Sequence, residues 1–70
     1  MKRKFVICLE NSGYRTSLIV RKVYQAMPDR AAEQRGMLRV IDESGEDYLF
    51  PCDLFSAIEI PRELQNRMTT

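Results

Sequence analysis

The feature that most constrains this chain is residues 37–51, Met-Leu-Arg-Val-Ile-Asp-Glu-Ser-Gly-Glu-Asp-Tyr-Leu-Phe-Pro. Two short runs of apolar residues flank a polar turn, which is the pattern of a β-hairpin. If the Ser-Gly pair centres the turn, Val40 faces Leu49, and a two-residue and a four-residue loop share this register. In the same register Ile41 faces Tyr48. We therefore expect a β protein.

Three more strands are predicted outside the hairpin. Residues 4–10 alternate in a β pattern, with Val6 and Cys8 on one face. Residues 15–26 are rich in β-branched and aromatic residues, and residues 57–60 can close the sheet. Because both faces of the first two strands are largely apolar, the sheet is expected to curl and pack on itself.

The connecting segments are short. Asp29 can cap one helical turn over residues 30–35, and Gly36 can end it. Residues 52–55 are compatible with a 3-10 turn, and residues 62–68 with a helical turn that follows a proline. These elements add local turns to a protein made mainly of strands.

Seventy residues leave room for one core, so residues 1–70 are expected to form a single domain. With 44% hydrophobic and 30% charged residues, the chain has the composition of a folded domain. The predicted fold class is mainly β. The predicted architecture is a small SH3-like barrel of about five short strands, with a 3-10 turn and a short C-terminal helical turn.

Residues 38–51, together with the phrase Arg-Lys-Val-Tyr at residues 21–24, resemble a group of short uncharacterised bacterial proteins. The similarity spans roughly residues 5–61. It implies a stand-alone bacterial domain with no established activity. A looser similarity to SH3 domains rests on Phe50 and Pro51, but the next aromatic residue falls one place late and tryptophan is absent. A groove for proline-rich peptides is therefore not expected.

The composition argues against catalysis. The chain has no histidine, which is the commonest general base and the usual partner of a nucleophilic serine or cysteine. It also lacks a glycine-rich phosphate loop. Cys8 and Cys52 lie far apart in sequence and cannot complete a structural zinc site without histidine. We expect reduced cysteines and a protein that is not an enzyme, with no cofactor and no metal.

No segment is expected to cross a membrane. The longest apolar run, residues 5–9, is far too short for a spanning helix. The basic residues before it are typical of the start of a signal peptide, but Glu10 interrupts the run before a signal core forms. The sequence therefore predicts a cytoplasmic location.

Charge is unevenly distributed although the net charge is only +1. Residues 1–39 hold nine basic and three acidic side chains, whereas residues 40–70 hold two basic and seven acidic ones. The candidate acidic tip of the hairpin consists of Asp42, Glu43, Glu46 and Asp47. The candidate basic patch consists of Lys2, Arg3, Lys4, Arg15, Arg21 and Lys22. The alternatives are a solvated turn for the tip and neutralisation across strands for both groups.

Two functions remain. The favoured one is a small non-catalytic binding module that takes part in protein–protein interaction or self-association, since small barrels expose strand edges. The alternative is RNA binding through the basic N-terminal strands, with Tyr14 and Tyr24 available for stacking. Strand alternation places Arg21 and Lys22 on opposite faces unless a bulge intervenes, which favours the protein partner.

Overall fold

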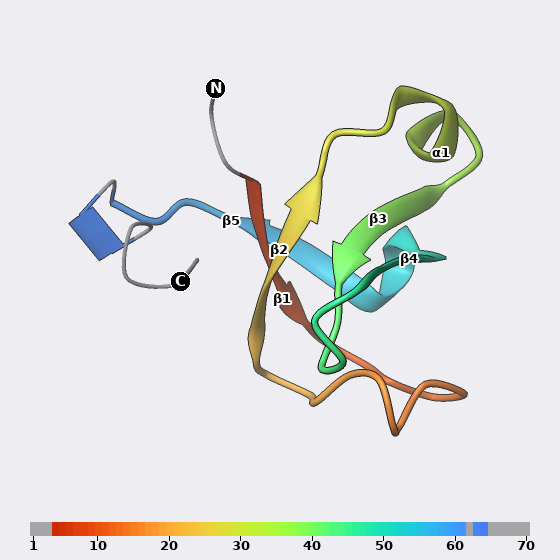
Figure 1. Ribbon diagram of the computed structural model, residues 1–70, viewed down its shortest axis with the longest axis horizontal. Coiled ribbons are helices and arrows are strands. Elements are labelled where there is room, and N and C mark those ends of the chain that lie inside the picture. The colour runs from red at the N-terminus through yellow and green to blue at the C-terminus, as the bar shows by residue number, and fades with distance from the viewer. Residues whose placement is uncertain (1–3, 62, 65–70) are drawn as a thin grey trace.

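The computed structural model describes residues 4–61, 63 and 64, and across them the chain forms a small, mainly β domain. A single antiparallel sheet has the strand order β4-β3-β2-β1-β5, so the first strand lies beside the last (Figure 1). The strands are β1 (Lys4–Cys8), β2 (Val23–Met27), β3 (Met37–Ile41), β4 (Asp47–Pro51) and β5 (Phe55–Ile58). A helix, α1 (Arg30–Gln34), joins β2 to β3, and a 3-10 turn, η1 (Cys52–Leu54), joins β4 to β5.

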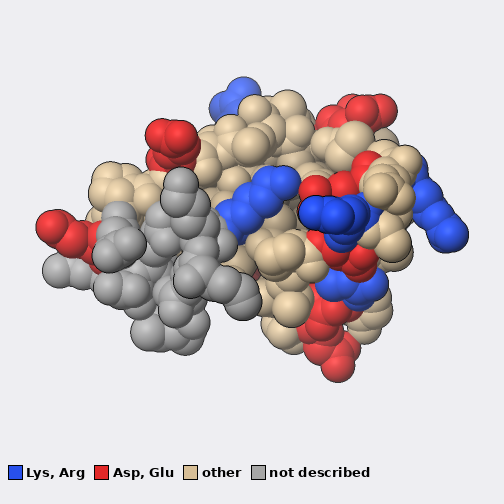
Figure 2. Space-filling model, turned by 90° about the horizontal axis from the view of Figure 1, so that it is seen from above, with Lys and Arg blue, Asp and Glu red and all other residues tan. Residues whose placement is uncertain are grey.

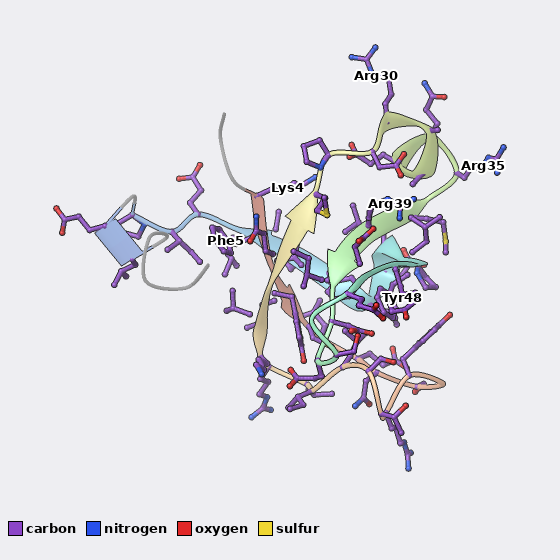
Figure 3. All side chains as sticks on the ribbon, viewed as in Figure 1. Lys4, Phe5, Arg30, Arg35, Arg39 and Tyr48 are labelled. Carbon is purple, nitrogen blue, oxygen red and sulfur yellow. The ribbon has the colours of Figure 1, made fainter. Side chains whose placement is uncertain are left out.

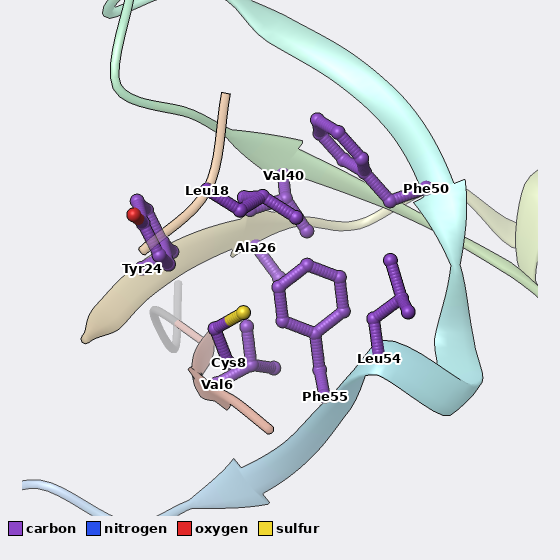
Figure 4. Packing of buried hydrophobic residues seen from close by; sticks show 9 residues of the cluster. All are labelled: Val6, Cys8, Leu18, Tyr24, Ala26, Val40, Phe50, Leu54 and Phe55. Atoms are coloured by element: carbon purple, nitrogen blue, oxygen red, sulfur yellow. The ribbon is translucent and has the colours of Figure 1, made fainter. Parts of the chain in front are cut away.

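The core lies against one face of the sheet (Figure 4). Val6 and Cys8 supply its β1 side, as the alternation of that strand predicted. Phe50 of β4 is the aromatic centre, with ring centroids 5.2 Å from Tyr14 and 6.1 Å from Phe55 in edge-to-face geometry. The buried members of the cluster are Val6, Cys8, Leu18, Tyr24, Ala26, Val40, Phe50, Leu54 and Phe55.

The predicted hairpin register is wrong by one residue. Val40 faces Tyr48 and not Leu49. The reason is the loop length. The Gly45 N–H donates to the Asp42 carbonyl at 3.0 Å, the Asp42 N–H donates to the Glu46 carbonyl at 3.1 Å, and Gly45 has φ +84°. This is a three-residue loop closed by a glycine bulge, and a loop of odd length shifts the register by one.

The predicted second strand is also too long. It was expected over residues 15–26, but β2 begins only at Val23. The preceding segment, residues 9–22, is here called the long loop. Within it Leu18 is completely buried in the core, and its carbonyl accepts a hydrogen bond from the Asn11 amide at 2.9 Å. Burying Leu18 requires the chain to fold back over the core, so its β-branched neighbours leave the sheet.

The short elements agree more closely with the sequence. Asp29 caps α1, because its carboxylate accepts a hydrogen bond from the Ala32 N–H at 3.0 Å. The last strand runs over Phe55–Ile58, two residues earlier than predicted. Most of the helical turn expected at residues 62–68 lies outside the described residues. Within its described part, the Leu64 N–H donates to the Pro61 carbonyl at 2.9 Å.

Candidate functional site

Asp42 belongs to the acidic tip but points into the turn. Only 7% of Asp42 is exposed, and one carboxylate oxygen accepts hydrogen bonds from the N–H, at 2.8 Å, and the hydroxyl of Ser44. An aspartate that binds the backbone two residues ahead stabilises a turn of this kind. The structure therefore gives Asp42 a local folding role.

The Glu43 side chain points away from the other acidic residues of the tip and connects the hairpin to the long loop. Its carboxylate lies 2.6 Å from the Lys22 ammonium and accepts a 2.6 Å hydrogen bond from the Tyr24 hydroxyl. That hydroxyl also accepts a 2.7 Å hydrogen bond from the Ile19 N–H. The Glu43 N–H donates to the Ser17 carbonyl at 3.0 Å. The hairpin turn and the long loop consequently lie side by side at the lower end of the sheet in Figure 1.

The contacts among the side chains of Lys22, Tyr24 and Glu43, together with the bond from the Ile19 backbone N–H to Tyr24, are here called the turn network. The Lys22 ammonium and the Tyr24 hydroxyl both hold the pKa of Glu43 below its usual value. Burial, followed by the hydrogen bond to this carboxylate, raises the pKa of Tyr24 far above its usual value. At neutral pH the network therefore contains an ionised glutamate and a neutral tyrosine.

Asp47 is paired as well. One Arg39 nitrogen donates to Asp47 at 2.9 Å and another donates to Asp29 at 2.8 Å. The Ala32 N–H and, after it, the Arg39 guanidinium lower the pKa of Asp29. Hydrogen bonds to the two carboxylates, first Asp29 and then Asp47, raise the pKa of Arg39. The arginine thus links the start of α1 to the start of β4.

Glu46 remains at the exposed end of the hairpin, where its carboxylate accepts a 2.9 Å hydrogen bond from the Tyr48 hydroxyl. This bond is the first cause of a raised pKa of Tyr48. Each carboxylate of the acidic tip therefore has its own partner. Within residues 4–61, 63 and 64, no group of three or more cysteines and carboxylates is placed to hold a metal ion.

The basic patch is dispersed in the part that the structure describes. Lys2 and Arg3 lie outside it. Lys4 stands at the end of β1 that is remote from the long loop (Figure 3). Cys8 lies four residue steps further along the strand, which corresponds to about 13 Å. The Arg21 N–H binds the Cys8 carbonyl at 2.6 Å, so Arg21 lies at the far end of that strand.

Arg21 and Lys22 form a bulge beside β1. The Cys8 N–H donates to the Lys22 carbonyl at 2.9 Å, and Arg21 has φ +71°, a left-handed conformation that usually favours glycine. The Lys22 ammonium, paired with Glu43, also lies 5.7 Å from the centroid of the Tyr24 ring. On the face shown in Figure 2, basic and acidic side chains are intermixed on one side of the molecule. Neighbouring charges of opposite sign weaken the field that a nucleic-acid groove requires.

Exposed apolar side chains form a feature that the sequence did not single out. Leu9, Ile19 and Val20 of the long loop are 55%, 51% and 41% exposed. The hydrogen bond between Arg21 and Cys8 brings the end of the loop back beside its beginning. The only signal in the sequence was the apolar run at residues 18–20, which resembled a strand. We call Leu9, Ile19 and Val20 the loop surface.

Both cysteines are free, and the buried Cys8 is not placed as a reactive group. Cys8 is buried, its Sγ donates to the Glu10 carbonyl at 3.2 Å, and burial raises the pKa of its thiol. A raised pKa keeps the sulfur in its unreactive thiol form. Cys52 lies at the start of η1, where its thiol is 3.8 Å from the Asp53 carboxylate.

Among the described residues, no helix has the length and apolar character needed to cross a membrane. Comparisons with models of protein families, with curated proteins and with solved structures gave no match to this chain.

Proposed function

We propose that this chain is a non-catalytic binding module with an SH3-like barrel architecture and that its ligand is a protein. The strand order, with a 3-10 turn before the last strand, supports the architecture. Barrel closure is supported by the contact between Phe50 of β4 and Phe55 of β5, because these strands stand at opposite ends of the sheet order.

The observation that carries the protein-binding function is the loop surface. Three large aliphatic side chains project from a loop that is otherwise held in place. Leu18 anchors the loop in the core, and the Ile19 N–H is fixed by Tyr24. A pre-ordered loop loses little conformational entropy when it binds, so its exposed apolar area contributes more fully to affinity. Scattered single residues would not support this proposal, but three on one tethered loop do.

Charge indicates the chemistry of the partner. Arg15 and Arg21 belong to the same long loop as Ile19 and Val20, are exposed and form no ion pair with the described residues. A partner that offers apolar side chains with carboxylates beside them would satisfy both features. We therefore propose an acidic, partly apolar protein segment as the ligand.

RNA is the second candidate, and the same two arginines support it. It ranks lower because Lys22 is neutralised by Glu43 and Lys4 stands about 13 Å along β1 from the bulge. The two candidates predict different dependence on salt. Binding to phosphates weakens steeply as salt rises, whereas contacts with apolar side chains respond little.

The test compares capture from a bacterial extract by the immobilised protein and by two variants. Ile19→Asp places a charge on the loop surface. Met27→Asp makes the same change at an exposed position on β2. The proposal expects a partner that Met27→Asp retains and Ile19→Asp loses. If both variants capture the same proteins as the parent, the loop surface does not bind protein. Nucleic acid that is lost on Arg21→Gln and in high salt would establish the second candidate.

A further inference from the structure

Among the described residues, the backbone groups on the outer edge of β4 have no hydrogen-bond partner, and the pairing of β4 with β3 identifies which groups these are. The Asp42 N–H donates to the Glu46 carbonyl, and the Cys52 N–H donates to the Gly36 carbonyl at 2.9 Å. Antiparallel ladders alternate bonded and non-bonded pairs, so Tyr48 and Phe50 make the ladder bonds to β3.

Asp47 and Leu49 therefore turn their N–H and C=O groups away from β3. β4 stands at the end of the sheet order, and no other described segment makes backbone hydrogen bonds to these two residues. Such an edge is a template for another strand.

The features that normally prevent an edge strand from pairing with another chain are weak in β4. A charged side chain commonly discourages pairing, but the charge of Asp47, the charged residue of β4, is paired with Arg39. Pro51 stands at the end of the strand, beyond the outward groups of Asp47 and Leu49. Tyr48 and Leu49 are adjacent and point to opposite faces, yet they are 49% and 41% exposed. Large apolar side chains on both faces of an edge strand favour its burial.

We propose that β4 pairs with β4 of a second copy of this chain, antiparallel about a two-fold axis at Tyr48. In this register Asp47 of each copy faces Leu49 of the other, and each facing pair exchanges two hydrogen bonds. All outward N–H and C=O groups of both residues are then satisfied. A register centred on Leu49 would instead place Asp47 opposite Pro51, which has no N–H to give.

Side chains support the same register. Tyr48 faces its own symmetry mate in a non-bonded pair, the position in which cross-strand side chains approach most closely. Two facing tyrosines add an aromatic contact to the backbone bonds. The other free edge is less suited, because Ser56 and Ala57 of β5 offer little apolar surface. The inference goes beyond the proposed function, because it names a surface other than the loop surface and a second copy of the chain as the partner.

The first experiment is sedimentation of the full chain from about 1 µM to 1 mM, the range in which modest interfaces are populated. We expect a reversible dimer. Leu49→Pro deletes an outward N–H and leaves the bonds to β3 in place, so it is expected to raise the dissociation constant about tenfold or more. The matched control is Ala57→Pro. The bond from the Leu9 N–H to the Leu54 carbonyl makes Ala57 an outward residue of β5. Ala57→Pro is expected to leave the dimer unchanged.

The second experiment tests the two-fold register and guards against misfolding of the proline variant. Tyr48→Lys and Tyr48→Glu each place like charges opposite one another, so each protein alone is expected to be monomeric. An equimolar mixture is expected to restore the dimer, because lysine then faces glutamate. Circular dichroism of each variant verifies its fold.

A parent chain that stays monomeric at the highest concentration would overturn the inference, as would two monomeric charge variants that do not associate when mixed. A dimer lost on Ile19→Asp and kept in Tyr48→Lys would place the interface on the loop surface instead. Partner capture that depends on Ile19 in a monomeric protein would retain the proposed function and refute only the edge pairing. A partner captured by the monomer and lost on Leu49→Pro would assign the edge to a different chain.

Discussion

Replacement of Tyr24 by phenylalanine is expected to destabilise the fold through one missing oxygen. Only 5% of Tyr24 is exposed, and its hydroxyl both accepts from the Ile19 N–H and donates to Glu43. Without it the Ile19 amide loses its acceptor in a part-buried hydrogen bond. A donor that is left unsatisfied away from water costs about 1–3 kcal/mol. Glu43 loses less, because it retains Lys22 and 27% of its side chain is exposed to water.

The expected loss is therefore about 2 kcal/mol in the free energy of unfolding, a large share of the few kcal/mol expected for a domain of this size. For a chain of this length it corresponds to a fall in melting temperature of about 10 °C. Urea unfolding at neutral pH, followed by circular dichroism, measures the loss in the free energy of unfolding. The same substitution is expected to speed exchange of the Ile19 amide hydrogen with solvent, which hydrogen exchange measures directly.

The matched control is Tyr48→Phe. It removes a tyrosine hydroxyl that donates to Glu46 at a solvent-exposed position. Its cost is expected to stay below about 0.5 kcal/mol. If Tyr24→Phe costs no more than this control, the turn network does not hold the long loop, and the argument for a pre-ordered loop surface fails with it.

Three further predictions concern the bulges, acid and metals. Arg21→Gly is expected to stabilise the protein by about 0.5–1 kcal/mol in urea unfolding, because glycine adopts the left-handed conformation without the strain of an arginine. Gly45→Ala is expected to cost about 1 kcal/mol. The cost comes from the left-handed backbone conformation, since the added Cβ would meet no atom within 4 Å. Folding lowers the pKa values of Glu43 and Asp29, so the stability that these two carboxylates contribute is complete above about pH 5 and is lost as the pH falls through their folded-state pKa values. The urea concentration at the unfolding midpoint should fall over that pH range, and it should fall less steeply in Glu43→Gln. Micromolar zinc or calcium should leave the melting temperature unchanged, and a rise would reveal a metal site that the described residues do not show.

Local pattern was sufficient for the elements of the hairpin but not for its register. Loops of two, three or four residues all fit the segment between Ile41 and Asp47. The choice depends on whether Gly45 takes a left-handed bulge, which in turn depends on the contacts of Asp42 with Ser44. The same residues fit a two-, three- or four-residue loop, so composition does not distinguish them. A single glycine can centre a turn or end it, and only the resulting packing decides.

The long loop could not be predicted for a related reason. Its β-branched residues favour a strand, but burial of Leu18 outweighs that local preference. The usual sequence marker of a bulge, glycine, is absent at the left-handed Arg21. The partners of the acidic tip were likewise hidden, since Glu43 finds Lys22 and Tyr24 about twenty residues away in the chain.

The position of β1 between β2 and β5 has a consequence for folding during synthesis. β2, α1 and the β3–β4 hairpin need only neighbouring segments of the chain, and such local contacts form early. β1 acquires its outer neighbour only when Phe55–Ile58 emerges, about fifty residues later. Until then its edge is open, and Val6 and Cys8 lack the cover of Phe55. A nascent chain of this protein therefore exposes its first strand longest, and that strand is where a chaperone would have most to protect.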